Sequence, residues 1–195
     1  MNTTVHALLG VALLARGERR IYAASALLGS LVPDLPMFVF FAWERFAVGL
    51  PDSQIWSEAY FRAPWQAFFD LFNSLPLIGI GWLVARRLDS PRGKVFAAGA
   101  LFHCLCDLPL HREDAHRHFY PLSHWRFVSP VSYWDPAHHA VAWSALESVV
   151  VLAAAWLLWW RFRQRGARAL VTLACGLTFL SWLVLYAMLD GGGFQ

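Results

Sequence analysis

The hydrophobic pattern along the chain predicts a set of helices separated by short polar breaks. A helix needs about 20 apolar residues to cross the hydrocarbon core of a bilayer, so the fourth, sixth and seventh runs are long enough to span. The first three and the fifth are shorter, and we expect them to be half-spanning or packed inside a bundle. The pattern predicts an all-α, polytopic membrane helix bundle that forms a single integral membrane domain over residues 1–195. The apolar runs cover approximately residues 5–15, 22–32, 37–48, 65–85, 95–108, 141–160 and 169–189.

Two breaks in this pattern have a distinctive sequence. The four residues Pro33-Asp34-Leu35-Pro36 are expected to stop the second helix. The longest polar connection, at about residues 109–140, holds six of the eight histidines and is expected to form a His-rich loop.

Composition agrees with a membrane protein. The chain is 58% hydrophobic and 15% charged, whereas a typical soluble domain is about 45–50% apolar and about 25% charged. The basic residues form no stripe interleaved with polar residues, so we expect no nucleic-acid partner. The three cysteines lie inside apolar runs and predict no disulfide framework. Because arginines follow the first apolar run and none precedes it, we interpret that run as a retained helix rather than a signal peptide.

Charge indicates which side each connection occupies. Eleven of the sixteen basic residues fall in three short connections, which the positive-inside rule assigns to the cytoplasm. Alternate threading then puts the start of the chain, Asp34 and the His-rich loop outside a bacterial inner membrane, with the third apolar run re-entering or lying along the surface. The eleven residues are Arg16, Arg19, Arg20, Arg86, Arg87, Arg92, Lys94, Arg161, Arg163, Arg165 and Arg168.

The polar residues within the apolar runs converge on the outer side. A carboxylate at a helix centre costs about 2.5–3.5 kcal/mol on insertion scales, so such residues usually face a bundle interior and find a partner. His103 and Asp107 are four residues apart and share one helix face. The convergent residues are His6, Asp34, Asp70, Asn73, His103, Asp107 and Glu147.

Imidazole and carboxylate groups together suit a divalent metal, with zinc as the first choice and manganese or iron as alternatives. Such a site can activate water for hydrolysis. We expect Glu147 and His139 to act as catalytic groups, and Asn73, Arg112 and Arg117 to bind a substrate phosphate. The candidate metal ligands are His6, Asp34, His103, Asp107, His111 and His118.

Each signal has a simpler alternative. His103 and Asp107 alone would also fit a hydrogen-bonded pair, Asp34 a helix cap, and the loop histidines a solvated surface. Two other functions stay open: a non-enzymatic membrane protein that binds a metal, a corrinoid or a partner protein, and a structural module folded around an ion. The sequence gives no indication of oligomeric state.

Several motifs resemble the membrane-bound, metal-dependent hydrolase family, which includes the LexA-binding, inner-membrane-associated hydrolases. The resemblance covers the chain up to about Glu147. The stretch from 107 to 139 is similar to small bacterial membrane proteins often labelled cobalamin biosynthesis proteins. The matching elements are His6, Gly29-Ser-Leu-Val-Pro-Asp34, Asn73-Ser74, His103-x-x-x-Asp107 and His138-His139.

The resemblance implies a hydrolase, and we expect it to act on a lipid or another phosphoester or ester at the outer membrane face. The wider pattern is also similar to zinc-dependent phospholipase C, whose His-x-x-x-Asp helix matches His103 and Asp107. A later His-x-x-x-Glu helix has no match, because Trp143 stands four residues after His139. Asn73-Ser74 stands where the membrane family tends to have His-Ser. Both departures favour a single metal over a full multi-zinc site.

Overall fold

The computed structural model describes residues 1–190, and within that part of the chain it is helical with no strand, which confirms the predicted all-α bundle. The elements are α1 (Thr3–Leu14), η1 (Gly17–Tyr22), α2 (Ala23–Leu31), η2 (Val32–Asp34), α3 (Leu35–Ala42), η3 (Trp43–Val48), α4 (Asp52–Gln54), η4 (Ile55–Ala59), α5 (Ala63–Phe72), α6 (Leu75–Arg87), α7 (Pro91–Asp107), η5 (Pro136–His138), α8 (Ala140–Arg161) and α9 (Arg165–Asp190).

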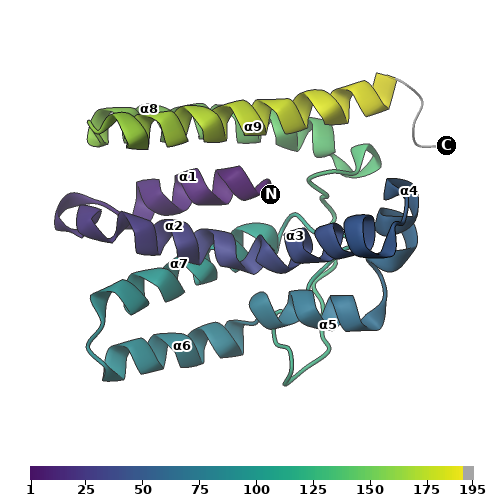
Figure 1. Cartoon of the computed structure of the whole chain (residues 1–195), viewed down its shortest axis with the longest axis horizontal. Helices are drawn as coiled ribbons and strands as arrows, with labels where there is room; N and C mark the ends of the chain where they lie inside the picture. The colour runs from purple at the N-terminus through teal and green to yellow at the C-terminus, as the bar shows by residue number, and fades with distance from the viewer. Residues whose placement is uncertain (191–195) are drawn as a thin grey trace.

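The helices form a layered bundle in which α1 is central (Figure 1). Helix α1 packs against α2, α7, α8 and α9, and α6 packs against the far side of α7. The apolar core lies between α1 and α8, where Val5 and Leu8 meet Val151, Ala154 and Leu158. The short first helix is therefore buried inside the bundle, as its length predicted.

Helices α2 and α7 approach each other closely at two glycines. A Cβ atom at Gly29 would lie 2.1 Å from the backbone oxygen of Phe96, and one at Gly99 would lie 2.9 Å from that of Ala26. Small residues allow membrane helices to bring their backbones into contact. This contact fixes the spacing between the end of α2 and the end of α7.

Four helical stretches are long and apolar enough to cross a membrane: residues 17–48, 63–87, 140–161 and 165–184. The three basic connections α1–α2, α6–α7 and α8–α9 lie at one end of the molecule (Figure 1). The chain is a multi-pass membrane helix bundle by these criteria, with eleven of its sixteen basic residues near that end.

One of two expected helix boundaries is correct and the other is wrong. Helix α2 ends at Leu31, next to the Pro33–Pro36 break, and each proline occupies the first turn of the following element, where no backbone N–H is needed. The expected fourth helix is instead divided at Asn73 and Ser74. Ser74 caps α6 by accepting a hydrogen bond from the Leu77 N–H at 3.2 Å.

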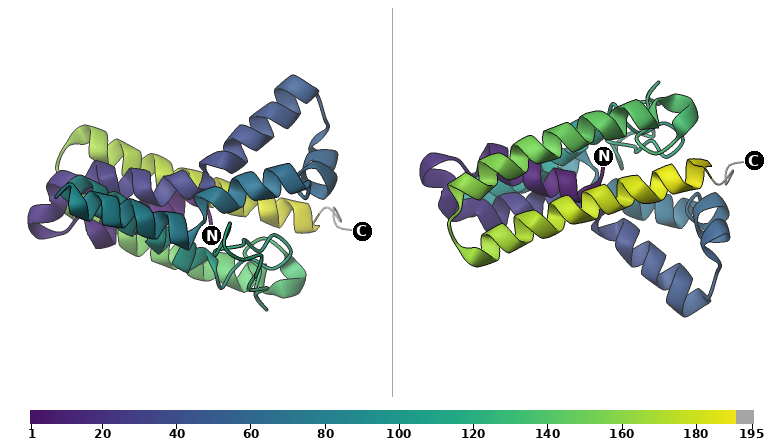
Figure 2. Two further views of the ribbon diagram at one scale, coloured as in Figure 1. Left: turned by 90° about the horizontal axis from the view of Figure 1, so that it is seen from below. Right: turned by 90° about the horizontal axis from the view of Figure 1, so that it is seen from above.

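Residues 35–72 form an arm that leaves the bundle (Figure 2). Helix α3 runs outward, the π-helical and short α-helical turns reverse the chain, and α5 returns. The arm has a small core of its own around Phe40, whose ring centroid lies 5.2 Å from that of Trp65 and 5.5 Å from that of Phe69. The end of the bundle opposite the basic connections is thus built from this arm and the His-rich loop.

Candidate metal centre

Three of the predicted ligands meet where α1 begins and α7 ends. His6 Nε2 lies 2.8 Å from Asp107 Oδ1, and His103 Nε2 lies 3.0 Å from Asp107 Oδ2. One ligand atom from each of the three residues lies within 4.8 Å of the others. The two imidazoles stack with their centroids 3.7 Å apart, and all three side chains are almost completely buried.

Asp34 and His111 join this group from the turn after α2 and the start of the loop. Asp34 Oδ1 lies 3.4 Å from His103 Nε2, and His111 Nε2 lies 3.5 Å from Asp107 Oδ2. Thr3 Oγ1 donates a hydrogen bond to Asp34 Oδ2 at 2.5 Å, which orients that carboxylate. Five of the six predicted ligands therefore form one connected group, which we call the His/Asp cluster.

The hydrogen bonds of His103 leave one nitrogen directed at carboxylates. Its Nδ1 lies 2.8 Å from the Ser30 backbone oxygen, which can only accept, so Nδ1 carries a proton. In the neutral ring Nε2 then presents a lone pair, yet it faces oxygens of Asp34 and Asp107. Only a proton or a metal cation between these atoms makes the arrangement favourable.

His111 repeats this arrangement. Its Nδ1 lies 2.8 Å from Asp114 Oδ2, and its buried Nε2 has no hydrogen-bond partner among the described residues. Metal-binding histidines usually donate their second N–H to a carboxylate or a backbone carbonyl, which orients the ring. Two or three imidazole nitrogens with two carboxylates form a donor set that suits zinc, manganese or iron. The residues present therefore fit a divalent metal.

The α-amino group of Met1 supplies a positive charge on one side of the cluster. It lies 2.8 Å from Asp107 Oδ1 and is buried with it. Asp107 Oδ2 faces the imidazoles of His103 and His111 instead. The second oxygen is thus the one left for an additional cation.

His118, the sixth predicted ligand, is buried beside this group. Its Nδ1 lies 3.1 Å from the backbone oxygen of Asn73 and donates to it. In the neutral ring Nε2 therefore carries no proton and presents a lone pair. Burial lowers the pKa of His118 and so favours the neutral, metal-binding form. The Asn73 side chain in turn donates to the backbone oxygen of Pro33 at 3.3 Å, tying the end of α5 to the turn that carries Asp34.

Outside the membrane-spanning segments, His111 has a perturbed pKa. Burial opposes the charged imidazole, but the carboxylates of Asp107 and Asp114 outweigh it and raise the pKa of His111 to about 9. At neutral pH the metal-free ring therefore holds a proton that a metal would have to displace.

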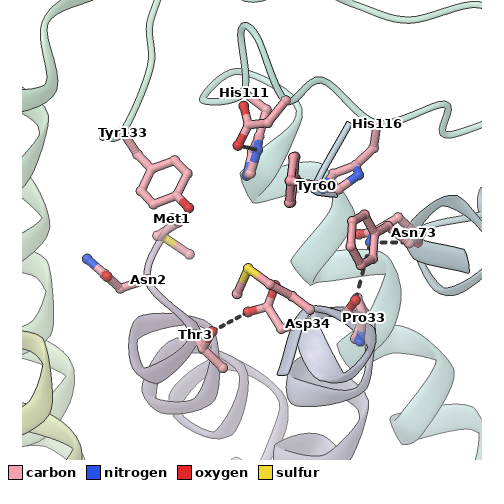
Figure 3. Close-up of a pocket in the computed structure, with 13 residues that line it drawn as sticks. Met1, Asn2, Thr3, Pro33, Asp34, Tyr60, Asn73, His111, His116 and Tyr133 are labelled. Atoms are coloured by element: carbon pink, nitrogen blue, oxygen red, sulfur yellow. Dashed lines mark hydrogen bonds and ion pairs between the residues drawn. The ribbon is translucent and has the colours of Figure 1, made fainter. Parts of the chain in front are cut away.

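A cavity of about 90 Å³ lies beside the His/Asp cluster. Figure 3 shows side chains from the start of α1, the turn at Asp34, the arm and the loop converging on it. The Tyr133 side chain extends toward Met1, and its ring packs on His111 with centroids 5.0 Å apart. The walls include Asp34, Met37, Tyr60, Phe69, His111, Asp114, His116 and Tyr133.

The two predicted catalytic groups have other contacts in the structure. Glu147 accepts hydrogen bonds from the backbone N–H of Asn2 at 2.9 Å and from its side-chain amide at 2.6 Å. His139 is exposed and precedes α8 with a left-handed backbone conformation. Glu147 thus contacts the segment that lines the cavity. The catalytic roles of both residues stay predictions.

The predicted phosphate-binding arginines also have partners. Arg117 binds Asp70 through both its backbone N–H and its guanidinium, which anchors the loop to α5. Arg112 donates to the backbone oxygen of Ser129 at 3.2 Å. Neither arginine lines the cavity. Their role in substrate binding stays a prediction.

Four titratable side chains that line the cavity were not among the candidate site residues from the sequence: Tyr60, Asp114, His116 and Tyr133. Asp114 stands three residues after His111, a spacing that places two side chains on the same side of a turn. This spacing in the sequence could have identified Asp114 as a partner of His111. The two tyrosines lie in the arm and far along the loop, and no spacing in the sequence connects them with the helices.

Comparison of the chain with protein-family models, with curated proteins and with solved structures finds no match. The likeness to membrane-bound hydrolases thus rests on the motifs alone, and the geometry of the site has to carry any functional assignment.

Proposed function

We propose that this protein is a metal-dependent hydrolase of the bacterial inner membrane, a member of the membrane-bound hydrolase family that its motifs resemble. Its site would face the outer side and act on a lipid or another phosphoester or ester. The main support is the meeting of His103 Nε2 with two carboxylates beside a polar cavity. Such a nitrogen calls for a proton or a metal cation, and the cavity offers room for a small reacting group.

In this proposal the His/Asp cluster binds the metal ion. His103, His111, Asp34 and Asp107 would hold the ion, with His6 or His118 completing its ligands. The ion would supply Lewis acidity, which polarises a phosphoryl or carbonyl oxygen and makes water more acidic. Zinc is our first choice of metal.

The cavity offers the groups that an ester hydrolase needs around its substrate. The carboxylate of Asp114 has one buried oxygen without a hydrogen-bond partner among the described residues, and the His116 ring lies beside it on the cavity wall. Either group is suited to accept a proton from water. Tyr60 and Tyr133 have hydroxyl groups that can donate to a substrate oxygen. The volume of about 90 Å³ fits a headgroup rather than an acyl chain.

The depth of the site supports a substrate that comes from the bilayer. Helix α7 runs from the basic end to the cluster in 17 residues, or about 26 Å. The hydrocarbon core is about 30 Å thick. If the basic connections face the cytoplasm, the cluster lies near the outer boundary of the hydrocarbon, where lipid ester and phosphate groups are found.

The first test is the metal content of detergent-purified, tag-free protein after a mild chelator wash, measured by elemental mass spectrometry. We expect one tightly bound zinc, manganese or iron ion per chain. His103→Ala and Asp107→Ala should lose it, whereas His124→Ala, which removes an exposed loop histidine, should keep it. The loaded protein would then be screened against phosphoester and carboxylic ester substrates, including phospholipids.

Two results would overturn the proposal. Full metal content in both cluster variants would mean that the ligand assignment is wrong. A metal-loaded wild type without hydrolytic activity, whose cluster variants only lose thermal stability, would instead favour a structural ion.

A further inference from the structure

The arm carries a continuous apolar face that no described element covers. Leu35, Phe38, Val39, Trp43 and Phe46 are all exposed, and Phe46 is 80% exposed. Their spacing of three or four residues puts them along one side of α3 and η3. Phe40 points the other way, into the core of the arm.

The length of the helical run suggests what covers this face. Residues 17–48 form one helical run of 32 residues, and the part that follows the basic residues of the first connection, residues 21–48, would be about 42 Å long if straight. This exceeds a hydrocarbon core of about 30 Å, and an apolar stretch that is too long tilts or bends to stay in lipid. The structure has such a bend, because α3 leaves the direction of the bundle after the two proline turns (Figure 2).

The tip of the arm has the composition of a membrane interface. Exposed Trp43 and Trp56 lie close in sequence to exposed Arg45 and Arg62. Tryptophan favours the boundary between headgroups and acyl chains, and arginine reaches from apolar surroundings to lipid phosphates. The surface of the arm is also continuous with that of the membrane-spanning run to which α3 belongs.

We infer that the arm lies within the outer leaflet of the bilayer, with the face formed by Leu35, Phe38, Val39, Trp43 and Phe46 against phospholipid acyl chains. The partner of this surface is the lipid itself. Because Tyr60 and Phe69 belong to the arm and also line the cavity, one wall of the cavity is then made by a lipid-embedded element. The position of the arm does not depend on whether the protein is a hydrolase.

Site-directed spin labelling tests this position directly. A nitroxide is attached at Phe46→Cys in a Cys106→Ala/Cys175→Ala background, while Cys104 is kept because it is buried. The protein is reconstituted in vesicles of phosphatidylethanolamine and phosphatidylglycerol. Collision rates are measured with oxygen, which concentrates in lipid, and with a water-soluble nickel chelate. We expect the label to collide more with oxygen than with the nickel chelate.

Two control positions calibrate the result. Leu28→Cys lies on an exposed face of α2 within the spanning run, and Leu122→Cys lies on the loop with 81% of the residue exposed. A label at Phe46 that behaves like the one at Leu122 would place the arm in water and overturn the inference. A label shielded from both reagents would mean that protein covers the face, such as a second copy of the chain, and would overturn it equally. Phe38→Cys provides a second arm position for which the same outcome is required.

Discussion

Asp107 Oδ2 lies 3.0 Å from His103 Nε2 while the other nitrogen of that ring is engaged by the Ser30 backbone oxygen. A neutral imidazole in this position would turn a lone pair toward a carboxylate. The pair therefore requires a proton or a metal cation between its two atoms. His103 lies one helix turn beyond Gly99, where α2 and α7 approach closely. The following predictions test the cluster and the scaffold that holds it.

The close approach of α2 and α7 should be sensitive to a single methyl group. Gly99→Ala would place a Cβ atom 2.9 Å from the backbone of Ala26 and Ser30, and we expect a loss of about 1–3 kcal/mol in the free energy of unfolding from overpacking. We also expect weaker metal binding, because Ser30 orients His103. Thermal or denaturant unfolding in detergent measures the first effect and metal titration the second.

Gly79→Ala is the matched control, since a Cβ atom at Gly79 in α6 meets nothing within 4 Å. There the loss of backbone freedom in the unfolded chain should make the variant neutral or more stable, by about 0.5–1 kcal/mol. Equal destabilisation by both substitutions would mean that the contact between α2 and α7 is not tight.

Asp114 should tune metal affinity without binding the ion itself, because it accepts the second N–H of His111. We expect Asp114→Asn to weaken metal binding by about 10–100-fold, the usual cost of losing such a partner. Isothermal titration with zinc measures this. His124→Ala removes an exposed histidine of the same loop that is not part of the cluster, and should leave the affinity unchanged. A loss in both variants would indicate that the whole loop is affected.

Metal binding should release protons. The raised pKa of His111, about 9, means that this ring is protonated at neutral pH in the metal-free protein. Metal displaces that proton, so its affinity should rise as the pH increases from 6 toward 9, by up to about tenfold per pH unit for each proton displaced, and fall as the pH is lowered. Titrations in two buffers with different ionisation enthalpies count the protons. A binding constant that is independent of pH would exclude His111 as a ligand.

Glu147 should behave as a positioning residue. Its carboxylate accepts hydrogen bonds from the backbone N–H and from the side-chain amide of Asn2. Glu147→Ala leaves these two donors unpaired and should lower the free energy of unfolding by about 1–3 kcal/mol. Metal content should stay the same. Glu58→Ala, at an exposed position of the arm, should have little effect. If Glu147→Gln instead abolished hydrolysis at unchanged stability, the catalytic role expected from the sequence would be correct.

The sequence predicted the main features of the fold and much of the cluster, because both depend on strong local signals. Apolar periodicity located the helices, and the three basic connections do lie at one end. The same threading indicated that His6, Asp34 and the pair His103 and Asp107 would converge. Their meeting depends on which ends of the helices adjoin, and the alternation of the chain largely determines this.

The missed features depend on tertiary packing. The prolines near Asp34 predicted the end of α2, but not that a 3-10 turn would join it directly to α3. Tyr133 reaches His111 only through the path of an irregular loop. The sequence also did not indicate the partners of Glu147 and the two arginines, which are Asn2, Asp70 and a backbone oxygen; the roles expected for these residues stay predictions.

The wide spread of the cluster along the chain has a consequence for biosynthesis. Its side chains come from positions 6, 34, 103, 107 and 111. A nascent chain that has inserted only its first two helices therefore has two of these five side chains and lacks Asp107, which contacts all three histidines. The loop that carries His111 has to fold onto the ends of α1 and α7 before the group is complete. Under the proposed function, the protein would therefore acquire its metal only after insertion, from the compartment where that loop emerges, and the availability of the ion there would determine how much of it matures.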